Sequence, residues 1–169
     1  MRMSDGVEWA AHCCTMLAVL PEGECLPAAR LAEYNELPTA YLAKHLQALT
    51  AAGVTESVPG PRGGFRLARP AAETTLLSIM QAIEGHAPAF RCTEIRQRGP
   101  GAIAGSPAYC EPCGIAAAMG RAEAAWRAEL AATTVADLLG HLIETAPPEL
   151  LAKGAEWVQT VRINRRTRT

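Results

Sequence analysis

The stretch LPAARLAEYNELPTAYLAKHLQALTAAGVTESVPGPRGGFRLAR, residues 26–69, decides the fold of this chain of 169 residues. Its first part predicts a helix over 27–36, because a proline is tolerated in the first turn of a helix. Pro38 ends this helix, since the residue before a proline is pushed out of the helical region. Thr39 can then cap a further helix over 40–52.

Two short strands follow these helices. The segments VTESV (54–58) and FRLAR (65–69) suit strands, and PGPRGG (59–64) between them has the glycines and prolines of a tight turn. Two helices joined by a short turn form a helix-turn-helix motif, and the hairpin after it occupies the position of a wing. This order predicts a winged helix-turn-helix unit and a fold class that is mainly α with a small β wing.

Further helices are expected on both sides of this unit. Apolar residues recur at helical spacing before it, over 5–20, and after it, over 74–84. An alanine-rich helix is expected over 114–132, followed by a short helix over 135–144. Residues 147–169 show one or two amphipathic turns at most, so we expect them to be weakly constrained.

The helix over 114–132 carries one continuous apolar stripe through Ile115, Met119, Trp126 and Leu130. A stripe of this length at the end of a small domain needs a partner surface to cover it. A copy related by twofold symmetry is the simplest such surface. We therefore expect a homodimer in which this segment is the dimerisation helix.

Charge is unevenly distributed, although the formal net charge is only −1. The segment 59–70 carries three arginines and residues 162–169 carry four, with no acidic residue in either. A basic face on an acidic remainder is compatible with a nucleic-acid partner. No apolar run reaches the roughly 18 residues of a membrane span, and the first residues lack a signal-peptide pattern. A cytoplasmic protein without a membrane partner is expected.

The exposed side of the helix over 40–52 is the expected DNA-reading surface. If Leu42, Leu46 and Leu49 are buried, its polar residues face outward, and the first turns of a recognition helix meet the base edges. Arg62 lies at the tip of the hairpin, where an arginine can pair with phosphate or enter a minor groove. We expect DNA contacts from Thr39, Tyr41, Lys44, His45, Arg62, Gly63 and Gly64.

The six cysteines indicate metal ligands or free thiols, because disulfide scaffolds are rare in the cytoplasm. Three of them, Cys92, Cys110 and Cys113, lie in a long loop over 91–113 that has little periodicity. A loop of this length inside a compact protein is usually functional or disordered. The spacing of Cys110 and Cys113, with two residues between them, is a moderate signal for a metal site.

The first helix offers further donors. Glu8 and His12 stand four residues apart and hence on one face, close enough to hold one metal ion. The other cysteines are not expected to be ligands: Cys13 and Cys14 are interpreted as packed thiols, and Cys25 as a loop residue without a role.

LPAARLAEYNELPTAYLAKHLQALTAAGVTESVPGPRGGFRLARP, with TLLSIMQAIEG and FRCTEI after it, resembles the Rrf-two (Rrf2-type) family of bacterial transcription regulators. The resemblance covers about residues 1–144. Its most specific pieces are YLAKHLQAL, GPRGGFRL and the cysteine group before the long helix. That family includes the regulator of iron–sulfur-cluster biogenesis and a nitric-oxide-sensing repressor. The resemblance implies a dimer, a winged helix that binds a partly palindromic operator, and in many members an iron–sulfur cluster.

The resemblance also suggests a ligand set. The cluster-binding members have three loop cysteines at closer and more even spacing, and here the middle one is displaced towards Cys113. Some members take a carboxylate from the first helix of the partner subunit, the position of Glu8, and histidine replaces cysteine in other two-iron centres. For a 2Fe-2S cluster we expect Cys110 and Cys113 of one subunit with Glu8 and His12 of the other, and Cys92 as a reserve ligand. Trp9 is either a packing residue or a switch whose rotamer answers to the charge of the cluster.

These interpretations divide the chain into a DNA-binding domain (1–86), a cluster-binding loop (87–113), a dimerisation segment (114–146) and a C-terminal extension with a basic tail (147–169). The expected function is a repressor whose operator affinity follows the redox state or integrity of the cluster. The alternatives are a cluster-free regulator that senses a small molecule or thiol oxidation, and a zinc-binding module. An enzyme is not expected, because a thiol–disulfide enzyme built on the Cys-x-x-Cys pair would need a βαβ setting.

Overall fold

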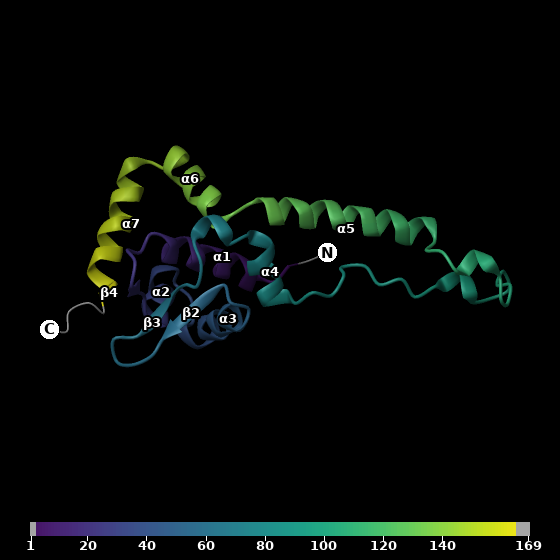
Figure 1. The fold of residues 1–169 in the computed structure, drawn as a ribbon, viewed down its shortest axis with the longest axis horizontal. Coiled ribbons are helices and arrows are strands. Elements are labelled where there is room, and N and C mark those ends of the chain that lie inside the picture. The colour runs from purple at the N-terminus through teal and green to yellow at the C-terminus, as the bar shows by residue number, and fades with distance from the viewer. Residues whose placement is uncertain (1–2, 165–169) are drawn as a thin grey trace.

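The structure, a computed structural model, describes residues 3–164 and is mainly helical (Figure 1). The helices are α1 (Asp5–Ala18), α2 (Ala28–Tyr34), α3 (Thr39–Ala51), α4 (Leu76–Glu84), α5 (Gly114–Ala132), α6 (Val135–Thr145) and α7 (Pro148–Val161). The strands are β1 (Glu24–Cys25), β2 (Thr55–Val58), β3 (Gly64–Leu67) and β4 (Ile163–Asn164). Short 3₁₀ turns are η1 (Ala71–Glu73), η2 (Ile95–Gln97) and η3 (Pro107–Tyr109). Within the described residues, every helix is too short or too polar to span a membrane.

The helix-turn-helix and its wing are confirmed. α2 and α3 follow each other across a short turn, and β2 and β3 form an antiparallel hairpin with Thr55 opposite Leu67. The prediction that Thr39 caps α3 is wrong, because the helix begins at Thr39 itself and Pro38 occupies the N-cap position without a side-chain cap. The hairpin is tied back to the body by an isolated bridge between Leu26 and Phe65.

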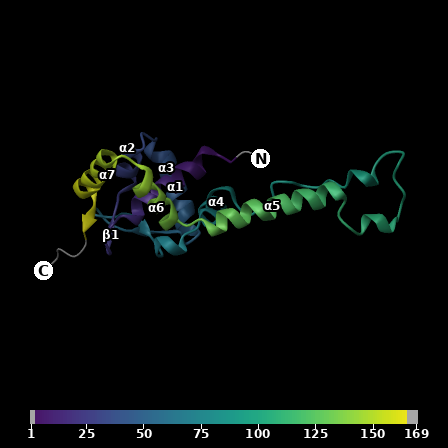
Figure 2. The same ribbon diagram turned by 90° about the horizontal axis from the view of Figure 1, so that it is seen from above.

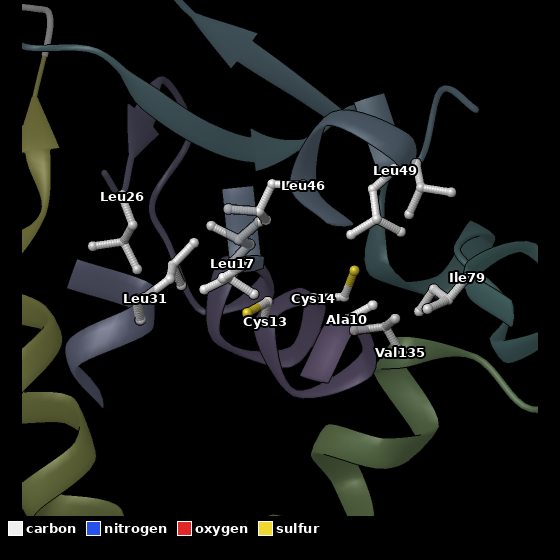
Figure 3. Packing of buried hydrophobic residues seen from close by; sticks show 13 residues of the cluster. Ala10, Cys13, Cys14, Leu17, Leu26, Leu31, Leu46, Leu49, Ile79 and Val135 are labelled. Atoms are coloured by element: carbon white, nitrogen blue, oxygen red, sulfur yellow. The ribbon is translucent and has the colours of Figure 1, made fainter. Parts of the chain in front are cut away.

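The hydrophobic core lies where α1 packs against the helix-turn-helix. One face of α1 meets α3 and α4, and Val135 at the start of α6 closes the cluster (Figure 3). Leu42, Leu46 and Leu49 of α3 are fully buried, as their spacing predicts. Each such side chain stabilises the fold by roughly 1.5–3 kcal/mol relative to an exposed one. The outward face of α3 is thereby held in a fixed orientation.

Three cysteines are buried in the body of the protein. Cys13 and Cys14 are fully buried in the core, as expected of packed thiols (Figure 3). Burial raises the pKa of the Cys13 thiol to about 12 and also raises the pKa of Cys14. The interpretation of Cys25 as a loop residue is wrong, because it lies buried in β1 with its Sγ 4.0 Å from the backbone oxygen of Arg62.

α5 projects away from the body and carries the cysteine loop at its far end (Figures 1 and 2). The chain leaves the body after α4, and the outgoing segment is held to α5 by a hydrogen bond from the Ala89 amide to Glu123. The chain rejoins the body at Thr134, whose side chain forms a capping box with Asp137 at the start of α6. The Val135 amide then donates to the backbone oxygen of Thr74 (2.8 Å), which anchors the base of α5.

The segment after residue 147 is more ordered than the sequence suggested. α7 spans 14 residues, and β4 pairs with β1, so the expectation of a weakly constrained extension is wrong. Val158 is buried, the rings of Tyr34 and Trp157 lie 4.7 Å apart, and Arg162 forms an ion pair with Glu24 at 2.8 Å. These partners are far away in the sequence. The tail arginines at 165, 166 and 168 lie outside the described residues.

Candidate nucleic-acid interface and metal centre

The start of α3 presents a polar, solvent-accessible face. Thr39 and Lys44 are exposed, and the Tyr41 side chain is 49% exposed. The buried leucines on the opposite face fix this orientation. The arrangement fits a recognition helix that offers hydroxyl and ammonium groups to DNA.

His45 does not share this exposed face, contrary to the expectation. Its ring is half-buried against α1, and a Cβ atom added to Gly6 would lie only 2.5 Å from His45 Cε1. The Nε2 atom of His45 is buried and has no hydrogen-bond partner within the described residues. His45 therefore connects α3 with α1 in this structure.

Trp9 joins the same contact. Its ring meets Tyr41 edge-on at a centroid distance of 5.4 Å and His45 at 6.0 Å. Trp9 is half-buried, so it packs between α1 and α3. Glu8, its neighbour in the sequence, is therefore one residue away from a side chain that contacts α3.

The wing presents Arg62 at its tip, where the residue is exposed. The two glycines after it have a structural requirement of their own. A Cβ atom at Gly63 would lie 2.0 Å from the backbone oxygen of Val58, and one at Gly64 would lie 2.4 Å from the backbone oxygen of Leu26. Both positions are half-buried. Glycine at these positions allows the hairpin to turn and its base to approach the body.

Replacing Gly64 by alanine is expected to lower the free energy of unfolding by about 3 kcal/mol, since the new methyl group meets backbone that cannot move aside. Thermal or urea unfolding measures this change. Gly140→Ala is the matched control, because a Cβ atom there meets nothing within 4 Å. Equal stability of the two variants would show that the base of the wing tolerates a side chain.

The proposed metal donors form two separate sets. Glu8 and His12 are exposed on one face of α1. Cys92 and Cys110 are exposed, and Cys113 is half-buried at the N-cap of α5, in the loop that α5 holds away from the body (Figure 1). Among residues 3–164, no three His, Cys, Asp or Glu side chains lie close enough together to hold a metal ion. One chain therefore does not bring the two sets together.

The Arg96 side chain holds the segments of the cysteine loop together, a role that was not predicted from the sequence. The Arg96 guanidinium donates to Glu94 (Nη2 to Oε2, 2.9 Å) and to the backbone oxygens of Ala108 (2.9 Å) and Glu111 (2.8 Å). It also lies over the Tyr109 ring, 5.5 Å from the centroid. The hydrogen bond with Glu94 is the main cause that raises the pKa of Arg96, and the negative charge of Glu94 and of Cys113 and Cys92 as thiolates contributes.

Tyr109 completes this organisation. Its hydroxyl donates to the backbone oxygen of Arg96 (3.0 Å) and accepts from the amide of Ile103 (3.0 Å). The sequence feature that could have indicated this role is the presence of an arginine and a tyrosine in a segment that is otherwise rich in glycine and proline. Their contacts give the loop a fixed shape without a hydrophobic core.

The predicted apolar stripe of α5 is largely uncovered in the single chain. Ile115 is 70% exposed and Met119 is 43% exposed, whereas Trp126 and Leu130 are half-buried. Within the described residues, α5 buries no side chain completely. Large apolar side chains gathered along one exposed helix are typical of an association surface.

Comparison with known sequences identifies a regulator family. The profile of the Rrf2 family, described as iron-dependent transcriptional regulators, matches residues 3–141. The HTH-type transcriptional regulator YwgB of Bacillus subtilis is 36% identical over 85 residues, which are 50% of this chain and 54% of YwgB. The chain thus spans about half the length of that relative. The HTH-type transcriptional regulator Rv1287 of Mycobacterium tuberculosis is 29% identical over 157 residues, 92% of this chain and 89% of Rv1287.

Solved structures share the fold. CymR of B. subtilis, the global cysteine regulator, superimposes with a TM-score of 0.63 at 22% identity and covers 83% of this chain and 98% of its own. IscR of T. potens gives a TM-score of 0.64 at 18% identity, over 89% of this chain and 96% of its own. These similarities confirm the predicted winged-helix fold class.

Proposed function

The chain belongs to the Rrf2 family of transcriptional regulators, and on this premise we propose that it is a dimeric repressor whose operator affinity is controlled by a 2Fe-2S cluster. Its relatives are transcriptional regulators and not enzymes. The observation that carries the proposal is the presence of two incomplete donor sets, Glu8 with His12 on α1 and the cysteines at the far end of α5, in which every side chain except the half-buried Cys113 is exposed.

The DNA-binding half of the proposal rests on the exposed start of α3 and the tip of the wing. Tyr41 and Lys44 would contact phosphates or bases, and Arg62 would reach the neighbouring groove or backbone. A twofold-symmetric pair of such units suits a double-stranded, partly palindromic operator. His45 is left out of the direct contacts, because its ring packs against α1.

The Arg62→Ala variant is expected to bind the operator more weakly by about 1–3 kcal/mol, while its fold and visible spectrum remain unchanged. The reason is the loss of one charged contact at an exposed hairpin tip. Anisotropy of a labelled operator measures the change, and Lys153→Ala at an exposed position of α7 is the charge-matched control. Operator affinity equal to that of the wild type would remove Arg62 from the interface.

The dimer is proposed to form along α5. This helix carries the exposed apolar stripe, and it keeps the cysteine loop away from the body of its own chain. A partner packed along α5 would bring the loop of one subunit over α1 of the other. Two copies in this arrangement form two equivalent sites, each with donors from both chains.

The donors suit a two-iron cluster in kind, although one chain does not assemble them. Cys110 and Cys113 provide thiolates, Glu8 a carboxylate and His12 an imidazole nitrogen, all of which are iron ligands. Cys92 is proposed as a reserve ligand. When bound, a 2Fe-2S cluster supplies one-electron redox chemistry at this position. Cys13, Cys14 and Cys25 are excluded as ligands because their thiols are buried in the body.

The residues that would transmit a change are those of the α1–α3 contact. Glu8 precedes Trp9, and the Trp9 ring meets Tyr41 and His45 of the recognition helix. A change in the charge that faces the Glu8 carboxylate would shift this turn of α1. Trp9 would pass the shift to α3, so its proposed role combines packing with switching.

Arg96 is proposed to hold the cysteine loop in the shape that ligation needs. Replacing it by methionine removes the hydrogen bonds to Glu94, Ala108 and Glu111 and retains a side chain of similar length. We expect chymotrypsin to cleave after Tyr109 at least about fivefold faster in Arg96→Met, because loop opening costs less free energy. The iron content should fall as well.

Arg98→Met is the matched control for this experiment, since within the described residues the Arg98 side chain makes one long hydrogen bond (3.4 Å), to the backbone oxygen of Thr93. Cleavage rates that are equal in wild type and Arg96→Met would show that Arg96 does not organise the loop. Visible spectra and metal analysis of the same samples separate a 2Fe-2S protein from a zinc protein or a cluster-free regulator.

A further inference from the structure

A cavity lies between the family core and the residues beyond it. Its volume is about 430 Å³, and its walls come from α1, α2, α6 and α7. The α7 wall, which includes Leu151, Gly154 and Val158, lies outside the residues 3–141 that the family profile matches. The volume falls in the range of roughly 300–1,000 Å³ that is usual for small-molecule sites.

The lining of this cavity is mostly apolar, and Met16, Leu139, Leu142 and Leu151 are among its residues. No lysine, arginine, aspartate or glutamate lines it among the described residues. Such a lining disfavours an ion, because burying a charge without a partner is costly. The compatible ligand is therefore neutral and mostly apolar.

A few polar groups face the cavity and could orient such a ligand. The Tyr34 hydroxyl lies at the wall beside Gly154, and within the described residues it has no hydrogen-bond partner. Asn35 uses its Nδ2 atom for the backbone oxygen of Leu31 (2.9 Å), which leaves its Oδ1 atom available. His12 of α1 is the remaining ring with polar atoms at this wall. Apolar pockets with a small number of polar groups are typical of ligand sites.

The position of the cavity connects it with the DNA-binding unit. Asn35 is the C-cap of α2 and begins the turn that leads into α3. His12 is also the residue proposed as a ligand of the cluster. In the proposed dimer the partner's cysteine loop would reach this cavity only at its His12 edge, while the apolar stripe available to a second copy runs along α5, which projects from the body in the other direction (Figure 1). A small molecule therefore suits the apolar remainder of the cavity, between α2, α6 and α7, better than a second chain does.

We propose that this cavity binds a small, neutral, mostly apolar molecule that donates a hydrogen bond to Asn35 and accepts one from Tyr34, and that its occupancy changes operator affinity through α1 and α2. Binding of the molecule does not depend on the proposed function. Its effect on operator affinity does rest on the proposed function. The α7 part of the wall lies beyond the residues that the family profile matches.

The neutral fluorophore N-phenyl-1-naphthylamine tests binding to the full chain without DNA. Wild type should show saturable binding of about one molecule per chain, and 1-decanol should displace it more effectively than decanoate does. Gly154→Leu and Ala155→Leu fill the cavity and should each weaken binding at least about tenfold, equivalent to about 1.4 kcal/mol. Ala152→Leu, an exposed position of α7 outside the lining, should bind as wild type does.

Binding that does not saturate, or that survives in both filled variants, would overturn the site. A wild-type dimer that excludes the fluorophore, together with a filled variant that dissociates into monomers, would show that a second copy covers this surface and would also overturn it. In the second step, 1-decanol at saturation should change operator affinity at least about threefold in wild type and leave Gly154→Leu unchanged. No change in wild type would overturn the coupling, whereas a wild type that binds no operator at all would instead contradict the proposed function.

Discussion

A mixed dimer of Glu8→Ala/His12→Ala chains with Cys110→Ala/Cys113→Ala chains is expected to hold about half of the iron of the wild-type dimer, although each double variant alone should hold none. In the mixed dimer, one site receives the cysteines of the first chain and the carboxylate and imidazole of the second. The other site lacks all four ligands. Differently tagged chains, co-expressed and purified in sequence, provide the mixed species for metal analysis and visible spectroscopy.

This result is expected because the structure keeps the two donor sets of one chain apart. Glu8 and His12 lie on α1 in the body, and the cysteines lie beyond the far end of α5 (Figure 1). Cys25→Ala is the control and should retain its iron, since the Cys25 thiol is buried in the body. A mixed dimer without iron, beside a loaded wild type, would place all the ligands in one chain. Loss of iron from a Cys92→Ala chain would show that Cys92 is a ligand of the cluster and not a reserve.

Reduced and oxidised protein, both with the cluster intact, are expected to differ at least tenfold in operator affinity, a difference of about 1.4 kcal/mol. In the proposed site, one electron would change the charge opposite the Glu8 carboxylate. The next residue, Trp9, contacts Tyr41 at 5.4 Å and His45 at 6.0 Å, so a shift of this turn reaches the recognition helix. A dimer tolerates little error in the spacing of its two recognition helices.

Anisotropy titrations of one operator, with dithionite-reduced and with air-oxidised protein, measure this difference. The iron content of both samples is determined alongside, so that loss of the cluster is not mistaken for a change of charge. Trp9→Ala should reduce the difference, because it removes the ring between α1 and α3. Equal affinities at equal iron content would show that the electron is not the signal, and cluster loss or modification would have to take its place.

The elements that the sequence predicts well have local causes. Pro38 separates α2 from α3, and the glycines of the hairpin force the turn between β2 and β3. The alanine-rich run gives α5 its length. Thr134 and Asp137, three residues apart, form the capping box that begins α6. In each case the residues that decide the structure are neighbours in the chain.

The features that were missed depend on partners far away in the sequence. The Trp157 ring of α7 packs against Tyr34, and β4 pairs with β1. Arg162, between α7 and β4, forms an ion pair with Glu24 of β1. The contact of His45 with Gly6 likewise joins two helices that packing alone brings together. Arg96 has no periodic pattern around it, so its role became visible only when the loop was folded. Local propensity does not report such contacts.

The most direct test of the central claim is the iron and acid-labile sulfide content of protein purified without exposure to air, with its visible spectrum. The account predicts about two iron and two sulfide per chain and absorption bands above about 400 nm. Protein that is folded, dimeric and able to bind its operator, but that contains no iron or contains zinc in its place, would contradict it.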